Sequence, residues 1–334
     1  MSKPYQCPPP NCVQIEAVEG CPLACWFCAL QVLRDNGADR DTQTHGSGSS
    51  PYKFLTLENA ELIAQSIALE GWRSSIVFAM HGEPTMHKQL PELIAIFRKH
   101  LPKNGLSITS NGAGLVTDTV AKIEALFAAG LNVLMFDDYE HADYVSRIRP
   151  MLDSVSIPWF EFPKDKEKFD RQKRHGKHIM LLECITHGNV NFHKITNQGG
   201  NSGSKKEAVP RRCAKPFREM SIRWDGNVAV CCDDWPGTYK LGNVLDIGVE
   251  AVWNHERMDA ARRRLYLKQR DFGPCRGCNV KTFRDGLLPD KFGKDVMPLP
   301  DEASAALIKE ALAGEPYTAK VKRTRFAASN DLLK

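Results

Sequence analysis

The sequence predicts an α/β fold in which a parallel sheet is followed by a smaller second domain. Two observations lead to this prediction. Between residues 13 and 195, short apolar runs alternate with segments of helical periodicity, and such alternation is typical of a parallel sheet covered by helices. A Gly-, Asn- and Ser-rich stretch from Asn197 to Ser204 then indicates a linker, with a domain boundary near residue 205.

The individual elements follow from local patterns. A first strand is expected at 13–18, where apolar and polar residues alternate, and a loop at 36–50, which is rich in Gly, Ser, Asp and Thr. Further strands are expected at 75–80, 106–111, 132–136, 155–162 and 178–185. Helices are expected at 57–69, 91–100, 118–129 and 301–313.

The most informative motif is the C-x3-C-x2-C run of Cys21, Cys25 and Cys28, directly after the first predicted strand. Three thiolates on one loop can hold three irons of a 4Fe–4S cluster and leave the fourth iron open for a ligand. A zinc site or buried core thiols are the alternatives, but structural zinc sites usually combine two separated ligand pairs. The spacing therefore favours a cluster with an open iron.

This motif, with Phe27 before its last cysteine, resembles that of the radical SAM superfamily. The resemblance implies that Cys21, Cys25 and Cys28 are catalytic cluster ligands and that the open iron binds the amino and carboxylate groups of S-adenosylmethionine (SAM). It also implies reductive cleavage of SAM to a 5′-deoxyadenosyl radical, which abstracts a hydrogen atom from the substrate. The expected fold is then a partial (β/α)6 barrel of the TIM type, and Phe27 is expected to pack near the adenine.

Gly82, Glu83 and Pro84 follow the second predicted strand and resemble the G-G-E-P motif of the superfamily, which binds the amino group of SAM. A glycine lets the backbone approach a ligand, and a carboxylate accepts hydrogen bonds from an ammonium group. His81 stands where the family usually has the first glycine. The alternative is an ordinary turn with a solvated glutamate.

Polar residues also follow the next two predicted strands. Ser110 and Asn111 resemble the end of the family's fourth strand and are expected to contact the ribose or the carboxylate of SAM; a simple Asn-Gly turn is the alternative. A polar cluster follows the strand at 132–136, and such a cluster can bind a cationic group or move protons. We favour a solvated turn for these residues, which are Asp137, Asp138, Tyr139, Glu140 and His141.

A second group of cysteines lies between residues 213 and 278. The Asp225-Gly226 pair in this block indicates the turn of a β-hairpin. The whole block resembles the SPASM/twitch extension of radical SAM enzymes, which implies a small α+β domain with one auxiliary 4Fe–4S cluster. The expected ligands are Cys213, Cys231, Cys275 and Cys278, with Cys231 favoured over Cys232. Four cysteines ending in C-x2-C could instead hold zinc.

Three parts of the chain are therefore predicted: a radical SAM core barrel at 1–204, a SPASM/twitch auxiliary domain at 205–290, and a C-terminal helix with a basic tail at 291–334. No apolar run approaches the ~18 residues that a membrane span needs, and no signal region is evident. We expect a cytoplasmic protein, in the host cytoplasm if it is viral. Its 11 cysteines then serve metal binding rather than disulfides.

The resemblance and the charge lead to one specific hypothesis. Basic runs and a net charge of +5 suit a polyanion such as DNA. The leading hypothesis is therefore a phage enzyme that converts N-linked to C-linked glycinylthymidine in DNA hypermodification. The alternatives are maturation of ribosomal peptides and oxidation of a small molecule or sugar alcohol with the auxiliary cluster as electron acceptor. A flavodoxin or a ferredoxin is the expected reducing partner.

Overall fold

The computed structural model describes residues 7–25, 27–30, 52–139, 142–167, 170, 176–184, 196–202, 209–280 and 301–313. Its largest element is an eight-stranded sheet with the order β10-β9-β1-β4-β5-β6-β8-β7. The strands are β1 (Cys12–Ile15), β4 (Ser75–Phe78), β5 (Leu106–Ser110), β6 (Val133–Phe136), β7 (Trp159–Phe162), β8 (His178–Leu182), β9 (Glu219–Ile222) and β10 (Val228–Ala229). A separate two-stranded sheet is formed by β2 (Val18–Glu19) and β3 (Lys53–Phe54).

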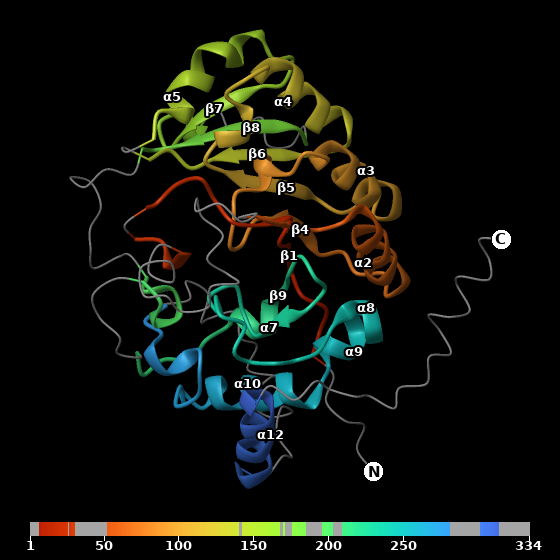
Figure 1. Ribbon diagram of the computed structural model, residues 1–334, viewed down its shortest axis with the longest axis vertical. Helices are drawn as coiled ribbons and strands as arrows, with labels where there is room; N and C mark the ends of the chain where they lie inside the picture. Colours follow the sequence, from red (N-terminus) through yellow and green to blue (C-terminus); the bar gives the residue numbers. More distant parts are fainter. Residues whose placement is uncertain are drawn as a thin grey trace, which may run out of the picture.

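The predicted α/β fold is confirmed. Neighbouring strands of the large sheet are parallel, except for the antiparallel pair β9 and β10. Helices α2 (Leu57–Leu69), α3 (Leu90–His100) and α4 (Thr119–Ala128) lie along one side of the sheet (Figure 1). This arrangement leaves the carboxyl ends of the strands facing one common region, where sites of parallel sheets form.

Local sequence explains how these helices begin and pack. The side chain of Thr56 accepts a hydrogen bond from the Asn59 backbone N–H at 3.1 Å, which caps the start of α2. The apolar stripe of α2, centred on Ile63, is buried against the sheet. Phe97 of α3 meets Phe78 of β4 edge-on, with 5.2 Å between the ring centroids. These contacts fix the strands that carry the site.

The last two strands of the barrel are exchanged relative to their order in the chain. β8 pairs in parallel with both β6 and β7, so β7 is the edge strand. The strand expected at 155–162 is also shorter than predicted, because α5 (Tyr144–Ile148) and the short helix η3 (Arg149–Ser154) precede it. The strands β1, β4, β5 and β6 keep chain order, and their ends form the site.

The cysteine-rich C-terminal block is built directly onto the sheet. β9 pairs in parallel with β1, and the predicted hairpin to β10 is present, with Gly226 in its turn at φ 84°. The rest of the block is mainly helical and fills the lower half of Figure 1. Its helices are α7 (Lys215–Arg218), α8 (Val244–Ile247), α9 (Val249–Trp253), α10 (Glu256–Tyr266) and α12 (Asp301–Ala313).

The stretch predicted as a linker is packed where the structure describes it. Asn197 is only 2% exposed, and its side-chain amide donates to the Gly277 carbonyl at 2.6 Å. The next residue, Gln198, accepts a hydrogen bond from the Ala29 backbone N–H at 2.8 Å. Residues 196–202 therefore join the N-terminal cysteine loop to the last cysteine pair, while the predicted boundary near 205 lies outside the described residues.

Other predictions also fall outside the described residues. They are the loop at 36–50, the acidic and histidine positions Glu140 and His141, and the basic tail beyond residue 313. Among the helices that the structure does describe, none has the length and apolar character that a bilayer crossing requires.

Candidate active site

The three loop cysteines and the ends of β4, β5 and β6 meet around one cavity of about 190 Å³. The cavity lies at the carboxyl ends of parallel strands, as expected for this type of sheet. Most predicted site residues line it: Cys21, Cys25, Phe27, Cys28, Gly82, Glu83, Ser110 and Asn111. Pro84 does not line the cavity but begins the short helix η1 (Pro84–Met86) behind it.

The cysteine loop is held against the end of β4 by backbone hydrogen bonds. The Gly20 N–H donates to the His81 carbonyl at 3.2 Å, and the Glu83 N–H donates to the Gly20 carbonyl at 2.8 Å. A Cβ atom on Gly82 would stand 2.1 Å from the Val18 carbonyl oxygen. Gly82 therefore permits close approach of two protein segments, which is a different reason from the ligand approach expected from sequence.

Glu83 is a fixed, buried carboxylate in the wall of this cavity. It is 2% exposed, and one oxygen accepts from the Thr85 N–H at 3.0 Å and from the Ser110 hydroxyl at 2.6 Å. The other oxygen accepts from the Asn111 N–H at 2.7 Å. Burial raises the pKa of Glu83, although these hydrogen bonds oppose the rise. The arrangement suits recognition of a cationic amino group.

The side chain of Asn111 turns to the cysteine loop. Its amide nitrogen lies 3.2 Å from the Cys21 sulfur, and its oxygen accepts from the Ala113 N–H at 2.9 Å. Burial raises the pKa of the Cys21 thiol to about 12, and the charge of Glu83 adds to the rise. A buried thiolate is therefore costly until a metal centre compensates its charge, and the Asn111 amide would then donate to a ligating sulfur.

The polar residues after β6 belong to the cavity, which corrects our preference for a solvated turn. Asp137 and Tyr139 both line it, and the Tyr139 hydroxyl lies 3.4 Å from the Asp137 carboxylate. The Tyr139 ring packs against Phe27 with 5.5 Å between centroids. Burial raises the pKa of Asp137 to about 6; the nearby charge of Glu83 adds to this rise.

Two cavity residues come from distant parts of the chain and were not predicted. Gln198 and Trp235 line the cavity beside the cysteine loop. Trp235 packs with Ala29 and Leu30, and it follows the Cys231-Cys232 pair by only a few residues. A single aromatic after a cysteine pair is no signal by itself, so sequence reasoning had no basis for choosing it.

The four predicted auxiliary ligands are all buried: Cys213, Cys231, Cys275 and Cys278 are each 7–8% exposed. Burial raises the pKa of all four thiols, as expected for sulfur atoms held away from water. Four buried thiols are the donor set that a fully ligated iron–sulfur cluster requires. Within the part of the chain that the structure describes, no three His, Cys, Asp or Glu side chains converge on a single-ion site.

Cys231 and Cys232 have different surroundings. Cys231 lies close enough to Cys275, another expected ligand, for the charge of a Cys275 thiolate to raise the Cys231 pKa. The Cys232 sulfur instead accepts a hydrogen bond from the Lys215 ammonium group at 3.0 Å. Lys215 also forms an ion pair with Asp233 at 2.5 Å. The environment therefore supports the choice of Cys231 as the ligand, and it makes Cys232 a hydrogen-bonded thiol at the edge of the cluster site.

His81 joins the two cysteine sites. One ring nitrogen lies 2.7 Å from the Glu16 carboxylate, and Nε2 lies 2.8 Å from the Cys232 carbonyl oxygen. His81 and Glu16 are 2% and 0% exposed, and the His81 ring lies 4.4 Å from the Trp235 ring. Burial alone would raise the pKa of Glu16. Its contacts with His81 and the Arg223 guanidinium have the larger effect, so the pKa is lowered overall. The contact positions the auxiliary hairpin against the cavity.

Comparison with known proteins agrees with these two sites. The radical SAM superfamily model matches residues 15–148, and the SPASM iron–sulfur cluster-binding domain matches residues 213–279. Both domains are therefore present, and each range contains one of the cysteine sites described above. The expected cofactors are confirmed by the domains, which imply a 4Fe–4S cluster with SAM and an auxiliary iron–sulfur cluster.

Two kinds of relative cover most of the chain. The S-adenosyl-L-methionine-dependent 2-deoxy-scyllo-inosamine dehydrogenase of Niallia circulans is 21% identical over 270 residues, which are 80% of this chain and 92% of that protein. The crystal structure of BtrN with AdoMet and 2-DOIA covers 81% of this chain and 93% of BtrN, with a TM-score of 0.59 and 18% identity. BtrN in an open conformation gives a TM-score of 0.54 and 15% identity, over 81% of this chain and 92% of BtrN. At these identities the likeness shows the fold, a partial-barrel core with a C-terminal cluster-binding domain.

Proposed function

Because the chain contains a radical SAM domain followed by a SPASM iron–sulfur domain, we propose that it oxidises a carbon that bears a hydroxyl or amino group. In such a reaction the substrate gives up a hydrogen atom to the SAM-derived radical, a proton to a protein base and an electron to the auxiliary cluster. The three losses together convert the alcohol or amine to a carbonyl or an imine. The single observation that carries the proposal is a series of contacts that connects the cavity to the auxiliary cysteines.

This series of contacts is short. Trp235 lines the cavity and lies 4.4 Å from the His81 ring, and His81 contacts the Cys232 carbonyl at 2.8 Å. The neighbouring residue in the chain is Cys231, an expected ligand of the auxiliary cluster. On the other side, Asn197 contacts the Gly277 carbonyl, between Cys275 and Cys278, at 2.6 Å. These contacts give a route by which an electron could pass from a substrate in the cavity to the auxiliary cluster.

Asp137 is the proposed base. It lines the same cavity, and a pKa raised to about 6 by burial is close to the pH at which the carboxylate would work. The Tyr139 hydroxyl can donate to this carboxylate and orient it. The remaining carboxylate, Glu83, is tied up by protein hydrogen bonds and serves binding rather than proton transfer.

The proposal is tested by anaerobic turnover with the reconstituted enzyme. The first compound to try is 2-deoxy-scyllo-inosamine, because a relative is named for its dehydrogenation. Oxidation predicts one 5′-deoxyadenosine per oxidised product and an auxiliary cluster that becomes reduced during turnover. We propose a flavodoxin or a ferredoxin as the physiological reductant. A product at the same oxidation level as the substrate would contradict the oxidation and favour an isomerase.

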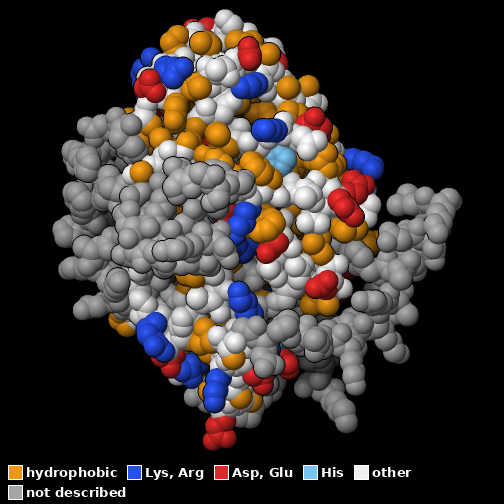
Figure 2. Space-filling view, viewed as in Figure 1, with side chains coloured by type: hydrophobic (Ala, Val, Ile, Leu, Met, Phe, Trp, Pro, Cys, Tyr) orange, Lys and Arg blue, Asp and Glu red, His pale blue; other side chains and the backbone are white. Residues whose placement is uncertain are grey.

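A second candidate is the isomerisation of N-linked to C-linked glycinylthymidine in phage DNA. The observation that favours it is the set of exposed cations, such as Lys164 and Lys166, which are 75% and 62% exposed and pair with carboxylates at the surface. On the face that Figure 2 shows, lysines and arginines of the described residues are interleaved with acidic side chains. Isomerisation would be redox-neutral, and DNA binding should weaken steeply as salt is added. A DNA affinity that does not change with salt concentration would contradict this candidate.

The proposed base gives a pH prediction. The Asp137 carboxylate is the active form, so product formation should fall as pH drops through about 6 and level off above it. The Asp137→Asn variant should lose about 100-fold or more in product formation and should lose this pH limb. SAM cleavage without product should persist. The measurement is the pH profile of product and of 5′-deoxyadenosine, and an unchanged acid limb in the variant would exclude Asp137 as the base.

The contact made by His81 gives a coupling prediction. His81→Ala should leave iron content and SAM cleavage close to wild type, because His81 is not an expected ligand. The ratio of product to 5′-deoxyadenosine should fall about tenfold, since the auxiliary hairpin loses its anchor at the Cys232 carbonyl. His81→Gln, which can keep one hydrogen bond, should recover part of the ratio. Equal ratios in all three proteins would show that the contact is only structural.

A further inference from the structure

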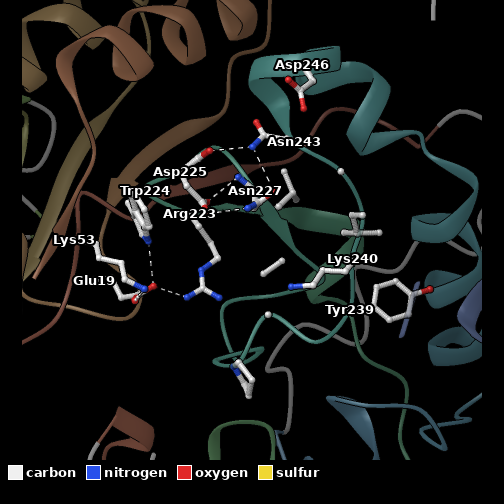
Figure 3. A pocket seen from close by; sticks show the side chains of 16 residues that line it. Glu19, Lys53, Arg223, Trp224, Asp225, Asn227, Tyr239, Lys240, Asn243 and Asp246 are labelled. Atoms are coloured by element: carbon white, nitrogen blue, oxygen red, sulfur yellow. Dashed lines mark hydrogen bonds and ion pairs between the residues drawn. The ribbon is translucent and has the colours of Figure 1, made fainter. Parts of the chain in front are cut away.

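A second cavity, of about 400 Å³, lies beside Glu19 of β2 and the β9–β10 hairpin. Its walls come from β2, β3, the β9–β10 turn and the segment from Pro236 to Asn243. Figure 3 shows this cavity from close by, with Glu19, Lys53 and Trp224 at one end. None of the expected cluster ligands lines it, and the proposed reaction does not use it.

Two cations point into the same space in this cavity. Arg223 and Lys240 approach it from opposite sides (Figure 3). The point where a Cβ of Gly237 would stand lies 2.6 Å from Arg223 Nη1 and 3.9 Å from Lys240 Nζ. Because Gly237 has no side chain, that space stays open. An anion placed between these two groups would be attracted by the Lys240 ammonium and could accept hydrogen bonds from both side chains.

Not every cation around the cavity has a carboxylate partner. The Glu19 carboxylate, 2% exposed, is paired with Lys53 at 3.1 Å and with Arg223 at 2.5 Å, and the buried Glu16 carboxylate lies 3.5 Å from Arg223. Among the described residues, no carboxylate pairs with Lys240. Two more carboxylates line the cavity: Asp225 accepts from the backbone and side chain of Asn227, and Asp246 lies at the end beside Asn243, away from Lys240 (Figure 3). Lys240, which has no carboxylate partner among the described residues, is therefore the cation available to a ligand in the open space.

The segment that carries these groups is rigid. The buried carboxylate of Asp234 accepts from the Thr238 N–H at 2.9 Å and from the Tyr239 N–H at 3.1 Å, and the Gly237 N–H donates to the Asp234 carbonyl at 3.0 Å. The Lys240 N–H donates to the Ala311 carbonyl at 2.9 Å. The backbone that carries Gly237 and Lys240 is thus already in place, so little ordering of this segment would oppose binding.

We propose that this cavity binds a phosphate ester of nucleotide size, with the phosphate between Arg223 and Lys240. A guanidinium and an ammonium are the two groups that proteins use most for phosphate. The volume is within the range of small-molecule sites, and Trp224 at one end of the cavity gives an aromatic surface for a sugar or a base. The phosphate could belong to a free nucleotide or to a nucleic acid chain, and the test separates these sources.

The experiment is calorimetric titration of the anaerobic holoenzyme with thymidine 5′-monophosphate and, as a matched probe without phosphate, thymidine. The monophosphate should bind at low salt and thymidine at least about tenfold more weakly, because it lacks the charge-assisted contacts. Lys240→Ala should weaken monophosphate binding about tenfold and leave SAM cleavage unchanged. Lys88→Ala, which removes a lysine that does not line the cavity, should leave binding at the wild-type value.

A second variant and a second probe complete the test. Gly237→Ala places a methyl group in the proposed phosphate position and should abolish monophosphate binding; a melting curve checks that the variant is folded, because Gly237 has a φ of 62°. Tighter binding of a short thymidine oligonucleotide than of the monophosphate, lost in Lys240→Ala, would identify a nucleic acid chain as the source. Equal binding of thymidine and its monophosphate, absence of binding, or an unaffected Lys240→Ala variant would overturn the proposal. These outcomes do not depend on whether the protein oxidises its substrate.

Discussion

Replacing Cys25 with alanine should reduce the reductive cleavage of SAM to background and remove about half of the iron. Cys25 is one of three thiols on a single loop, and its side chain is buried at 7% exposure beside the cavity. A cluster with an open iron depends on all three thiolates, and a loop with two leaves a second iron without a protein ligand. The measurement is 5′-deoxyadenosine formed under dithionite, together with iron and sulfide content.

Two controls make this result specific. Cys184→Ala removes a thiol that does not line the cavity, and it should retain wild-type iron and cleavage. Cys275→Ala should also lose about half of the iron but keep some cleavage of SAM without product, because the loop cluster is intact. If Cys25→Ala still cleaved SAM, the assignment of the loop as the catalytic cluster site would be wrong.

Replacing Gly82 with alanine should have the next largest effect, although Gly82 is neither a ligand nor a base. The added Cβ would meet the Val18 carbonyl oxygen at 2.1 Å and the Gly20 carbonyl oxygen at 2.6 Å. These are backbone atoms, which cannot rotate away, so the cysteine loop must move. Overpacking of this kind costs roughly 1–3 kcal/mol of stability, and displacement of the loop by about 1 Å should reduce SAM cleavage roughly 100-fold.

The matched control is Gly105→Ala. A Cβ at Gly105 meets only the Ser75 hydroxyl, at 4.0 Å, so the added methyl group has room. This variant should keep the wild-type rate and melting temperature. A Gly82→Ala protein with normal cleavage would show that the loop does not depend on its contact with the end of β4.

Much of the fold could be predicted because its signals are local. The helices at α2 and α12 have the residue ranges expected from apolar periodicity, and the Asp225-Gly226 turn is where a hairpin was expected. The two cysteine sites could also be predicted, since the spacing of ligands on one loop is a property of neighbouring residues. The exchange of β7 and β8 was not, because strand order depends on packing between distant segments.

The parts of the site that escaped prediction depend on contacts far apart in the chain. The contact from His81 to Cys232 spans 151 residues, and that from Ala29 to Gln198 spans 169. The polar neighbours of Asp137 in sequence favour a solvated residue, whereas in the structure it lines a cavity together with residues at the ends of β4 and β5. A polar residue at a strand end is therefore ambiguous until the neighbouring strands are placed.

The parallel pairing of β9 with β1 makes the start of the auxiliary domain part of the same sheet as the core. β1 leads through the short strand β2 to the cysteine loop, and β9 covers its otherwise open edge. An uncovered edge strand is a template for pairing with other chains. The C-terminal block is thus a structural component of the barrel as well as a carrier of iron. A chain shortened to the barrel would expose the edge of β1 and be prone to self-association. An exchange of auxiliary domains between such enzymes therefore has to keep a strand in the position of β9.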